Sequence, residues 1–473
     1  MVPRWFVSAA AVALMGCATA PPVPVKPDEV PKAFDAPMPE TGGRSISAAW
    51  WESFGSPELT GLVSAAQTGN LDVEAAAARV EQARAQTGVV ASALFPAISV
   101  DADAGRQGTH APTSGSSSSN SVSLASAASY EFDFWGAQRN AWSAARHSAR
   151  AAQYARDVVM LTTEADVANT YFTVLAIRQR IIIARNNINA AKRVLAVTLA
   201  KVTNGTLSHL ELAQQTAQVR GQEAQIPTLE EQEREARYAL AVLLGRMPES
   251  LEIEVASLEG IAAPAVEPGT PLSLLSHRPD VAQAEADLLA AHANLDAARA
   301  SFLPSIGLSA NGGWSAATLA SLVNLSNLAW NIGASLAQTV FDGGRLSSQR
   351  DVAKGREAEL IAAYRKAVLS ALADAEAGLG SATAYAEQER LIADEAGNAA
   401  QAFRISELQY REGVVDLLTV LQAQQTLFSS QDSLVQVKLA QLQAGVRMFR
   451  ALGGGWVANE SEPTRNSFMP LPF

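Results

Sequence analysis

The chain has 473 residues, carries a net charge of −11 and is 48% hydrophobic but only 6% aromatic. The negative charge excludes a nucleic-acid-binding protein, because such proteins draw much of their affinity from Lys and Arg on phosphates. Ala, Leu, Gln and Glu dominate long stretches, which favours long helices packed through small residues.

The first residues, 1–16, are predicted to be a secretory signal peptide. Their apolar run, Trp5–Leu14, is too short to cross a bilayer, which needs about 20 residues. Leu14-Met15-Gly16-Cys17 resembles a bacterial lipobox, so we expect Cys17 to be acylated, and the Ala after it implies sorting to the outer membrane. The alternative is an ordinary secretory signal with an incidental cysteine. Because Cys17 is the only cysteine, no disulfide can form within one chain.

A Pro-rich stretch, residues 17–43, follows the cysteine and is predicted to be an extended tether with no core of its own. At the other end of the chain, residues 457–473 are predicted to be a C-terminal tail.

The rest of the chain is an internal repeat with an offset near 208 residues. We predict a first repeat over residues 44–250, a linker over 251–276 and a second repeat over 277–456. Each repeat has the order helix, strand, loop, strand, long helix, turn, long helix. The matching segments include Leu94-Phe95-Pro96-Ala97-Ile98 with Phe302-Leu303-Pro304-Ser305-Ile306, and Gly205, Leu207 and Leu210 with Gly413, Val415 and Leu418.

Alternating apolar and polar residues predict four strands, at about 96–104, 122–135, 304–311 and 328–341. Segments that are apolar on one side and polar on the other fit the lipid-out, lumen-in pattern of a transmembrane barrel. The alternative is a soluble sandwich with one wet face. The polar segments Gly105–Asn120 and Gly312–Asn327 are predicted to be flexible loops outside the cell.

Four acidic residues fall on the polar side of the predicted strands: Asp101, Asp103, Glu131 and Asp133. In a barrel they would make an electronegative exit that favours cations. Solvated carboxylates without a role in selectivity are the alternative.

Two very long helices are predicted. Residues 137–202 contain no Pro or Gly, an uninterrupted stretch of 66 positions or roughly 100 Å, and residues 344–411 are comparable. Each should turn back at a glycine, at Asn204-Gly205 and Glu412-Gly413, and Pro227 should bend the second helix of the first pair. The last helix carries a heptad seam at Leu421, Phe428, Val435, Leu442 and Phe449.

These elements imply an assembly, because four strands cannot close a barrel and an open sheet edge in lipid leaves backbone groups unpaired. Eight strands would enclose an interior filled by side chains, whereas twelve leave room for a pore. A homotrimer is therefore preferred, and a tetramer stays open by this arithmetic.

Several segments together resemble the outer-membrane efflux lipoproteins, the NodT branch of the TolC-like outer-membrane factors. The resemblance implies an α+β membrane protein, in which a trimeric 12-stranded β-barrel continues into a long α-helical barrel. It also implies a periplasmic adaptor protein and an inner-membrane, proton-driven transporter of the resistance-nodulation-division type as partners. The segments are Trp50-Trp51-Glu52-Ser53-Phe54-Gly55-Ser56-Pro57-Glu58-Leu59, Arg278-Pro279-Asp280-Val281, Ala298-Arg299-Ala300-Ser301-Phe302-Leu303-Pro304, Phe341-Asp342-Gly343-Gly344-Arg345 and Gly413-Val414-Val415-Asp416-Leu417-Leu418.

The resemblance also implies a periplasmic gate on the helix after the second turn. Leu418 occupies the family's Leu position, whereas Gln422 and Gln425 replace its Asp and Arg. We expect an apolar ring of Leu418 with hydrogen-bonding glutamines, and the alternative is that Leu418 packs in the helical core. The turns that would contact the adaptor are Asn204, Gly205 and Thr206, and Glu412, Gly413 and Val414.

No catalytic cluster is apparent, so we predict that the chain is not an enzyme and needs no cofactor or metal. Gly453-Gly454-Gly455 lacks the Lys of a phosphate-binding loop, and His277-Arg278-Pro279-Asp280 is interpreted as a helix start. The predicted function is a passive exit duct for drugs or other small toxic compounds. A duct for type I protein secretion and a lipid-tethered coiled-coil scaffold are the alternatives.

Overall fold

The computed structural model describes residues 25, 29–36, 47–111, 115–264 and 269–458. The predicted signal peptide, Cys17, most of the predicted tether and nearly all of the tail lie outside these residues. The chain divides into two compact units. We call Ala78–Gln153 with Gln283–Lys366 the strand unit, and Val25–Ala77, Tyr154–Ala282 and the described residues from Ala367 onward the helix unit.

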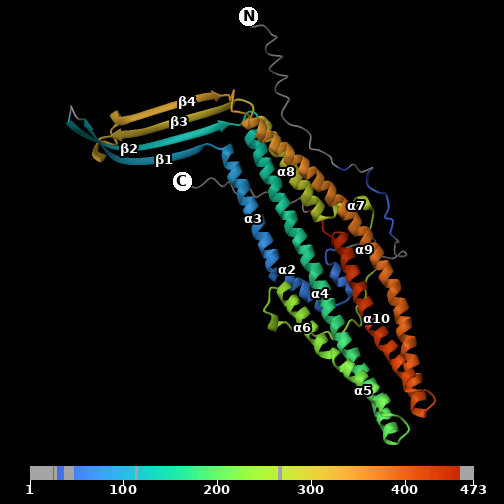
Figure 1. Ribbon diagram of the computed structural model, residues 1–473. Helices are drawn as coiled ribbons and strands as arrows, with labels where there is room; N and C mark the ends of the chain where they lie inside the picture. Colours follow the sequence, from blue (N-terminus) through green and yellow to red (C-terminus); the bar gives the residue numbers. More distant parts are fainter. Residues whose placement is uncertain (1–24, 26–28, 37–46, 112–114, 265–268, 459–473) are drawn as a thin grey trace. The chain divides into compact units, whose positions relative to one another are not determined.

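The strand unit contains a four-stranded antiparallel sheet whose order in space follows the order in sequence (Figure 1). Four strands were expected, two from each half, and four are present in the described residues. They are β1 (Ala97–Ala111), β2 (Gly115–Phe132), β3 (Ser305–Ala316) and β4 (Leu328–Ala337).

The first hairpin extends farther than predicted. Pairing continues from Gly105 with Ser121 to Ala111 with Gly115, so the prediction that Gly105–Asn120 is a flexible loop is wrong. Gly and Ser have weak strand preference, but each further pair here only extends a ladder that has already formed. At its other end β2 stops at Phe132 instead of residue 135.

The second hairpin departs less from the prediction. β3 reaches Ala316, so the first residues of the expected loop Gly312–Asn327 are strand. The remainder holds two short 3-10 turns, η5 (Leu319–Ser321) and η6 (Leu325–Asn327), whose own hydrogen bonds order it. β4 ends at Ala337, four residues before the predicted end.

The long helices are confirmed: α4 covers Ala137–Thr203 and α9 covers Arg345–Glu412, 67 and 68 residues. α5 (His209–Glu223) and α6 (Gln225–Leu243) follow α4, and α10 (Leu417–Ala451) follows α9. α5 and α6 separate at Ala224, just before Pro227, which confirms the predicted interruption because a proline ring clashes with the carbonyl four residues earlier. The other helices are η2 (Trp50–Phe54), α2 (Pro57–Gly69), α3 (Leu71–Ala91), η3 (Ser92–Leu94), η4 (Pro248–Ser250), α7 (Pro271–Ser276) and α8 (Pro279–Ala300).

Searching the described part of the chain finds no helix whose length and hydropathy together would let it cross a membrane.

The core of the helix unit is built around aromatic residues of η2, α4 and α10. Trp50 is 1% exposed and stacks on Phe449 with 5.3 Å between ring centroids, and Phe54 lies 5.2 Å from Phe172. Along α10 the heptad positions from Phe428 to Phe449 are buried, which confirms the predicted seam.

Each repeat is closed by an equivalent hydrogen bond. Asn70, which precedes α3, donates its amide to the carbonyl of Leu243 at 2.8 Å. Arg278, which precedes α8, donates to the carbonyl of Ala451 at the same distance. Both partners of the second bond lie 208 residues after those of the first, so the sequence offset is also an equivalence in space.

A close glycine contact is repeated in the same way. Gly245 and Gly453 both have positive φ, and a Cβ on them would lie 1.9 Å from the carbonyl oxygen of Gly69 and 2.0 Å from that of His277. Only glycine fits such an approach. The Gly453–Gly455 segment therefore has a packing role, and α8 begins at Pro279 as the helix-start interpretation required.

Candidate functional site

The strand register divides the sheet into one apolar and one polar face, because directly paired residues share a face. The apolar face carries Ile98, Val100, Ala102, Ala104, Val122, Leu124, Ser126, Ala128, Tyr130, Phe132, Ile306, Leu308, Ala310, Trp314, Leu328, Trp330, Ile332, Ala334 and Leu336. The polar face carries Ser99, Asp101, Asp103, Ser123, Ala125, Ala127, Ser129, Glu131, Gly307, Ser309, Asn311, Gly313, Ala329, Asn331, Gly333 and Ser335. The alternation predicted strand by strand thus holds across the whole sheet.

Three of the four acidic candidates, Asp101, Asp103 and Glu131, lie exposed on the polar face. Asp133 lies just past the end of β2. Its carboxylate accepts the backbone N–H groups of Gln138 and Arg139 at 3.0 and 2.9 Å and forms an ion pair with the Arg139 side chain at 3.1 Å. Asp133 therefore caps the start of α4, which is also why β2 ends before it.

Neither face of the sheet is covered within the strand unit. On the apolar face Ile98, Trp330 and Ile332 are 76%, 73% and 76% exposed. The outer strands β1 and β4 each have a neighbour on one side only within the described chain. The sheet therefore offers two free edges and an apolar surface that one copy cannot bury.

The two helical hairpins of the helix unit end in the same turn geometry. Gly205 and Gly413 have φ of 72° and 79°. In the first turn the N–H groups of Gly205 and Thr206 donate to the carbonyls of Val202 and Lys201. The second turn repeats both bonds between Gly413 and Val414 and the carbonyls of Tyr410 and Gln409. Both turns are Schellman motifs, which satisfy the last carbonyls of α4 and α9.

The helix that follows each turn is capped by its own side chains. Ser208 caps α5 together with Glu211, whose carboxylate accepts from the Ser208 N–H at 2.8 Å. Asp416 caps α10 by accepting from the Thr419 N–H at 2.9 Å. The hydrogen bonds from Ser208 and Thr419 hold the pKa values of Glu211 and Asp416 below their usual ranges. Short polar caps thus fix where both helices begin.

Contacts between α4 and α9 hold the two tips at the same level. Lys201 donates its ammonium group to the Tyr410 carbonyl and lies 4.5 Å from the centre of the Tyr410 ring. The Thr198 hydroxyl lies 3.0 Å from the Tyr410 hydroxyl, and both residues are buried. Lys201 and Tyr410 precede their turn glycines by four and three residues, so the turns lie side by side (Figure 1).

The gate candidates share one exposed face of α10. Leu418 is 59% exposed, and Gln422 and Gln425 follow it at helical spacing, also exposed. By contrast Leu417 and Val420 beside them are buried. Leu418 is therefore not part of the core of its own chain, contrary to the alternative interpretation. Gln425 also lines a groove of about 560 Å³ between α4, α5, α6 and α10.

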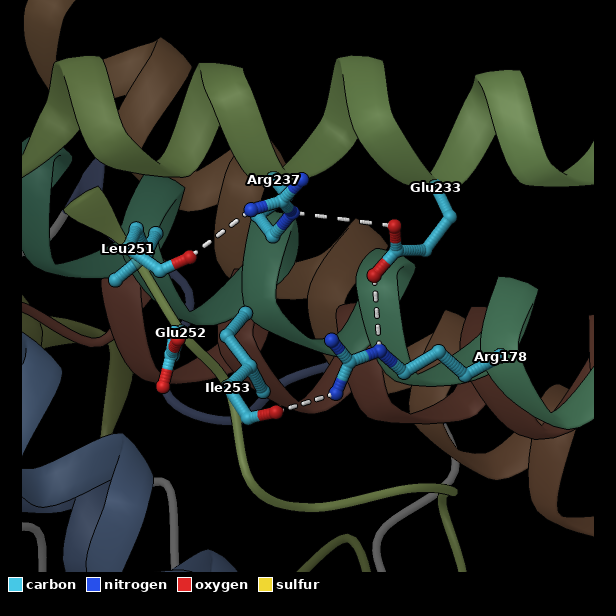
Figure 2. A pocket seen from close by; sticks show the side chains of 6 residues that line it. All are labelled: Arg178, Glu233, Arg237, Leu251, Glu252 and Ile253. Atoms are coloured by element: carbon cyan, nitrogen blue, oxygen red, sulfur yellow. Dashed lines mark hydrogen bonds and ion pairs between the residues drawn. The ribbon is translucent and has the colours of Figure 1, made fainter. Parts of the chain in front are cut away.

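A clamp on the residues after α6 was not predicted. Two arginines hold carbonyls of this extended segment: Arg178 those of Ile253 and Val255 at 2.7 and 2.9 Å, and Arg237 that of Leu251 at 3.1 Å (Figure 2). Glu233 pairs with Arg178 at 2.9 Å, and a polar pocket of about 360 Å³ lies between them. The alternation of apolar and acidic residues from Leu251 to Val255 was the only sequence signal.

The end of the Pro-rich segment also docks on the helix unit, where a tether with no core was predicted. The N–H groups of Asp35 and Ala36 both donate to the Glu376 carboxylate at 2.9 Å. Val30 is buried, and Phe34 packs on the aromatic core. We call residues 29–36 the strap.

The described residues contain no group of three or more His, Cys, Asp or Glu side chains that could hold a metal ion. His292 instead hydrogen-bonds to Glu357 at 2.7 Å within the strand unit. No convergent set of nucleophile, base and acid accompanies it, so the prominent surfaces are the two-faced sheet and the hairpin tips.

Comparison with known proteins agrees with these surfaces. The family model "Outer membrane efflux protein" matches residues 62–246 and 271–454. The pyoverdine export outer membrane protein OpmQ of Pseudomonas aeruginosa is 40% identical over 86% of this chain and 87% of its own, and OpmQ of Pseudomonas putida is 36% identical over 96% and 97%. The solvent efflux pump outer membrane protein SrpC of Pseudomonas putida is 30% identical over 87% and 88%.

Among solved structures, that of the outer-membrane channel OprN superposes with a TM-score of 0.84 at 26% identity, covering 93% of this chain and all of OprN. Family and fold are those of channel proteins rather than enzymes. The chain therefore belongs to the outer membrane efflux protein family and is an outer-membrane channel component of an efflux pump.

Proposed function

We propose that three copies of the chain close a twelve-stranded barrel that is the passive exit duct of a tripartite efflux pump. The observation that carries this proposal is the four-stranded sheet with two free edges. In hydrocarbon each unpaired backbone group costs several kcal/mol, so β1 of one copy has to pair with β4 of the next. Eight strands would be filled by side chains, and twelve leave a pore.

The apolar face is proposed to face lipid and the polar face the lumen. The apolar ladder on β2 runs from Val122 to Phe132, which is about 33 Å along the strand at ~3.3 Å per residue. A tilt of about 40° reduces this to about 25 Å, the height of the apolar band of outer-membrane barrels. Small residues such as Gly, Ala and Ser on the other face would leave the lumen open, and Asp101, Asp103 and Glu131 would make it electronegative.

Cys17 is proposed as the acylated N-terminus that anchors the mature chain in the outer membrane. The Leu14-Met15-Gly16-Cys17 segment supports this assignment. An acyl chain contributes about 0.8 kcal/mol per buried CH₂, so several chains on one cysteine anchor firmly. Docking of the strap on Glu376 would fix the far end of the tether to the protein.

The hairpin tips are proposed to contact a periplasmic adaptor protein, which would connect the duct to a proton-driven transporter of the resistance-nodulation-division type. The turn residues Asn204, Gly205 and Thr206, and Glu412, Gly413 and Val414, are exposed and rigidly held, as a docking surface needs. One turn farther along α10, Leu418 is proposed to form the apolar constriction, with Gln422 and Gln425 hydrogen-bonding around it. Such a constriction gates by excluding water.

The cargo is proposed to be a small molecule of the kind that pyoverdine represents. Two relatives named for pyoverdine export are 40% and 36% identical, against 30% for a relative named for solvent efflux. Deleting the gene should lower the amount of such a compound in the culture medium and raise it inside the cell. Loss of a secreted protein instead would favour a type I secretion duct.

The assembly is tested on the purified full-length protein in detergent and in planar bilayers. We expect a particle of about three times the 49.7 kDa of one chain and a measurable ion conductance. A stable monomer, or a trimer that passes no ions, would overturn the duct and favour a scaffold.

A further inference from the structure

We infer that Leu210 and Gln214 of α5 line the same constriction as Leu418 and Gln422 of α10, so that a trimer closes with six leucines instead of three. This inference rests on the proposed gate and assigns it a second set of residues. It follows from the internal repeat, which places the same two side chains on both hairpins.

The repeat is identical at these exposed positions. At the offset of 208, Leu210 matches Leu418 and Gln214 matches Gln422. Most other positions of α5 differ from their partners in α10, including buried ones such as Val219, which matches Leu427. Core positions tolerate exchange among apolar residues of similar size. Identity of two exposed residues has no such packing reason, which points to a shared role.

The backbone places both pairs in the same local frame. Each leucine lies five residues after the glycine of a Schellman turn and two residues after the cap, Ser208 or Asp416. Leu210 is 66% exposed and Leu418 is 59% exposed. Each lies nine residues before a buried residue, which at 100° per residue places it on the opposite side of its helix from the protomer core. Both leucines therefore point away from their own chain.

The two pairs also lie at one level of the helix unit. Lys201 of the first hairpin contacts Tyr410 of the second both through its ammonium group and over the ring. This contact keeps the two turns side by side, and the leucines start one helical turn from them. Side chains at one level can contribute to one ring, whereas staggered hairpins would give two separate constrictions.

The chemistry of the combined ring is uncharged. Six leucines backed by six glutamine amides would exclude water from a narrow pore without any ionisable group at the constriction. Closed-state conductance set by this ring should therefore not follow the protonation of the ring itself. Since the glutamines can donate and accept, neighbouring hairpins can hydrogen-bond to one another when the ring is closed.

Cysteine accessibility in planar bilayers tests the inference on the full-length protein. The only cysteine of the chain is Cys17, so a cysteine introduced at the tips reacts against a simple background, with the wild type as reference. We would add a charged, water-soluble thiol reagent to Leu210→Cys, Leu418→Cys and Leu199→Cys. Leu199 is an exposed leucine near the end of α4, 51% exposed, and serves as the matched control.

We expect the reagent to change the conductance of both Leu210→Cys and Leu418→Cys and to leave that of Leu199→Cys unchanged. Leu210→Ala should raise closed-state conductance to an extent similar to Leu418→Ala, and the double variant should conduct more than either. An effect at Leu418 but not at Leu210 would overturn this inference and leave the gate in place. No effect at either position would overturn the gate itself. Trimer yield in detergent shows whether each variant has assembled.

Discussion

The strand unit and the helix unit treat their apolar side chains in opposite ways. In the helix unit Trp50 and Val420 are 1% and 0% exposed. In the strand unit Trp330 and Ile332 are 73% and 76% exposed although they lie in a regular sheet. One unit is therefore stabilised by its own contacts, whereas the other depends on surroundings that a single chain does not provide. Stability measurements should separate the two.

The largest effect is expected from the aromatic core of the helix unit. Trp50→Ala removes a buried ring that stacks on Phe449 and should lower the free energy of unfolding by about 3–5 kcal/mol. Trp330→Ala in the sheet, measured in detergent, should change it by less than about 0.5 kcal/mol. Guanidinium titrations followed by helical circular dichroism provide the measurement. Equal losses for both variants would remove the distinction between the units.

A charge on the sheet should have an effect that depends on its face. Ile332 and Asn331 are neighbours on β4 with opposite faces. In lipid vesicles Ile332→Arg should cost about 2–4 kcal/mol because an arginine would enter the hydrocarbon, whereas Asn331→Arg would stay in water. Urea unfolding from vesicles compares the two. A larger loss for Asn331→Arg would mean that the assignment of the faces is inverted.

A buried carboxyl group predicts a pH dependence in the helix unit. Glu164 is 7% exposed, and burial raises its pKa from 4.5 to about 6 despite a hydrogen bond from Gln67 at 2.7 Å. The folded state thus binds this proton more tightly than the unfolded state, so stability is lost as the pH rises through about 6. Glu164→Gln should be more stable than the wild type at pH 7 by about 2 kcal/mol, with the difference vanishing below pH 4.5.

The matched control for this prediction is Glu52→Gln, which changes an exposed carboxyl group of η2. It should alter stability by less than about 0.5 kcal/mol. Thermal unfolding of both variants between pH 4 and pH 8 provides the comparison. A Glu164→Gln variant whose stability runs parallel to the wild type would contradict the raised pKa.

The smallest effect is expected where the strap docks on the helix unit. Glu376→Ala removes the acceptor of two backbone N–H groups. A hydrogen bond to a charged group contributes about 1.5 kcal/mol or more, so trypsin should cleave after the exposed Lys32 at least about 10-fold faster. Glu387→Ala, which breaks only an ion pair with Arg390 within α9, is the control. Equal cleavage rates in the two variants would mean that Glu376 does not hold the strap.

Features with a period could be predicted from sequence alone. The two faces of the sheet, the lengths of α4 and α9 and the seam of α10 follow from repeats of two, 3.6 and seven residues, which short-range chemistry sets. The tip glycines were recognised because a helix end needs a residue that adopts positive φ. The internal repeat then transferred each of these conclusions from one half of the chain to the other.

Features that depend on a distant partner could not be predicted. The serine-rich end of the β1–β2 hairpin has the composition of a loop and becomes strand only because its two halves pair. Asp133 fits the strand pattern, yet two N–H groups of the next helix capture its carboxylate. The strap and the Arg178 clamp join residues more than 70 positions apart, and no local pattern marks them.

The hydrogen bonds from Asn70 to Leu243 and from Arg278 to Ala451 give each half of the chain its own clasp. A half of this kind returns its last helix to its first without help from the other half. Joining two of them in one polypeptide means that three encounters between chains can complete a ring of six similar parts. It also lets the two halves diverge, so that asparagine fastens one and arginine the other.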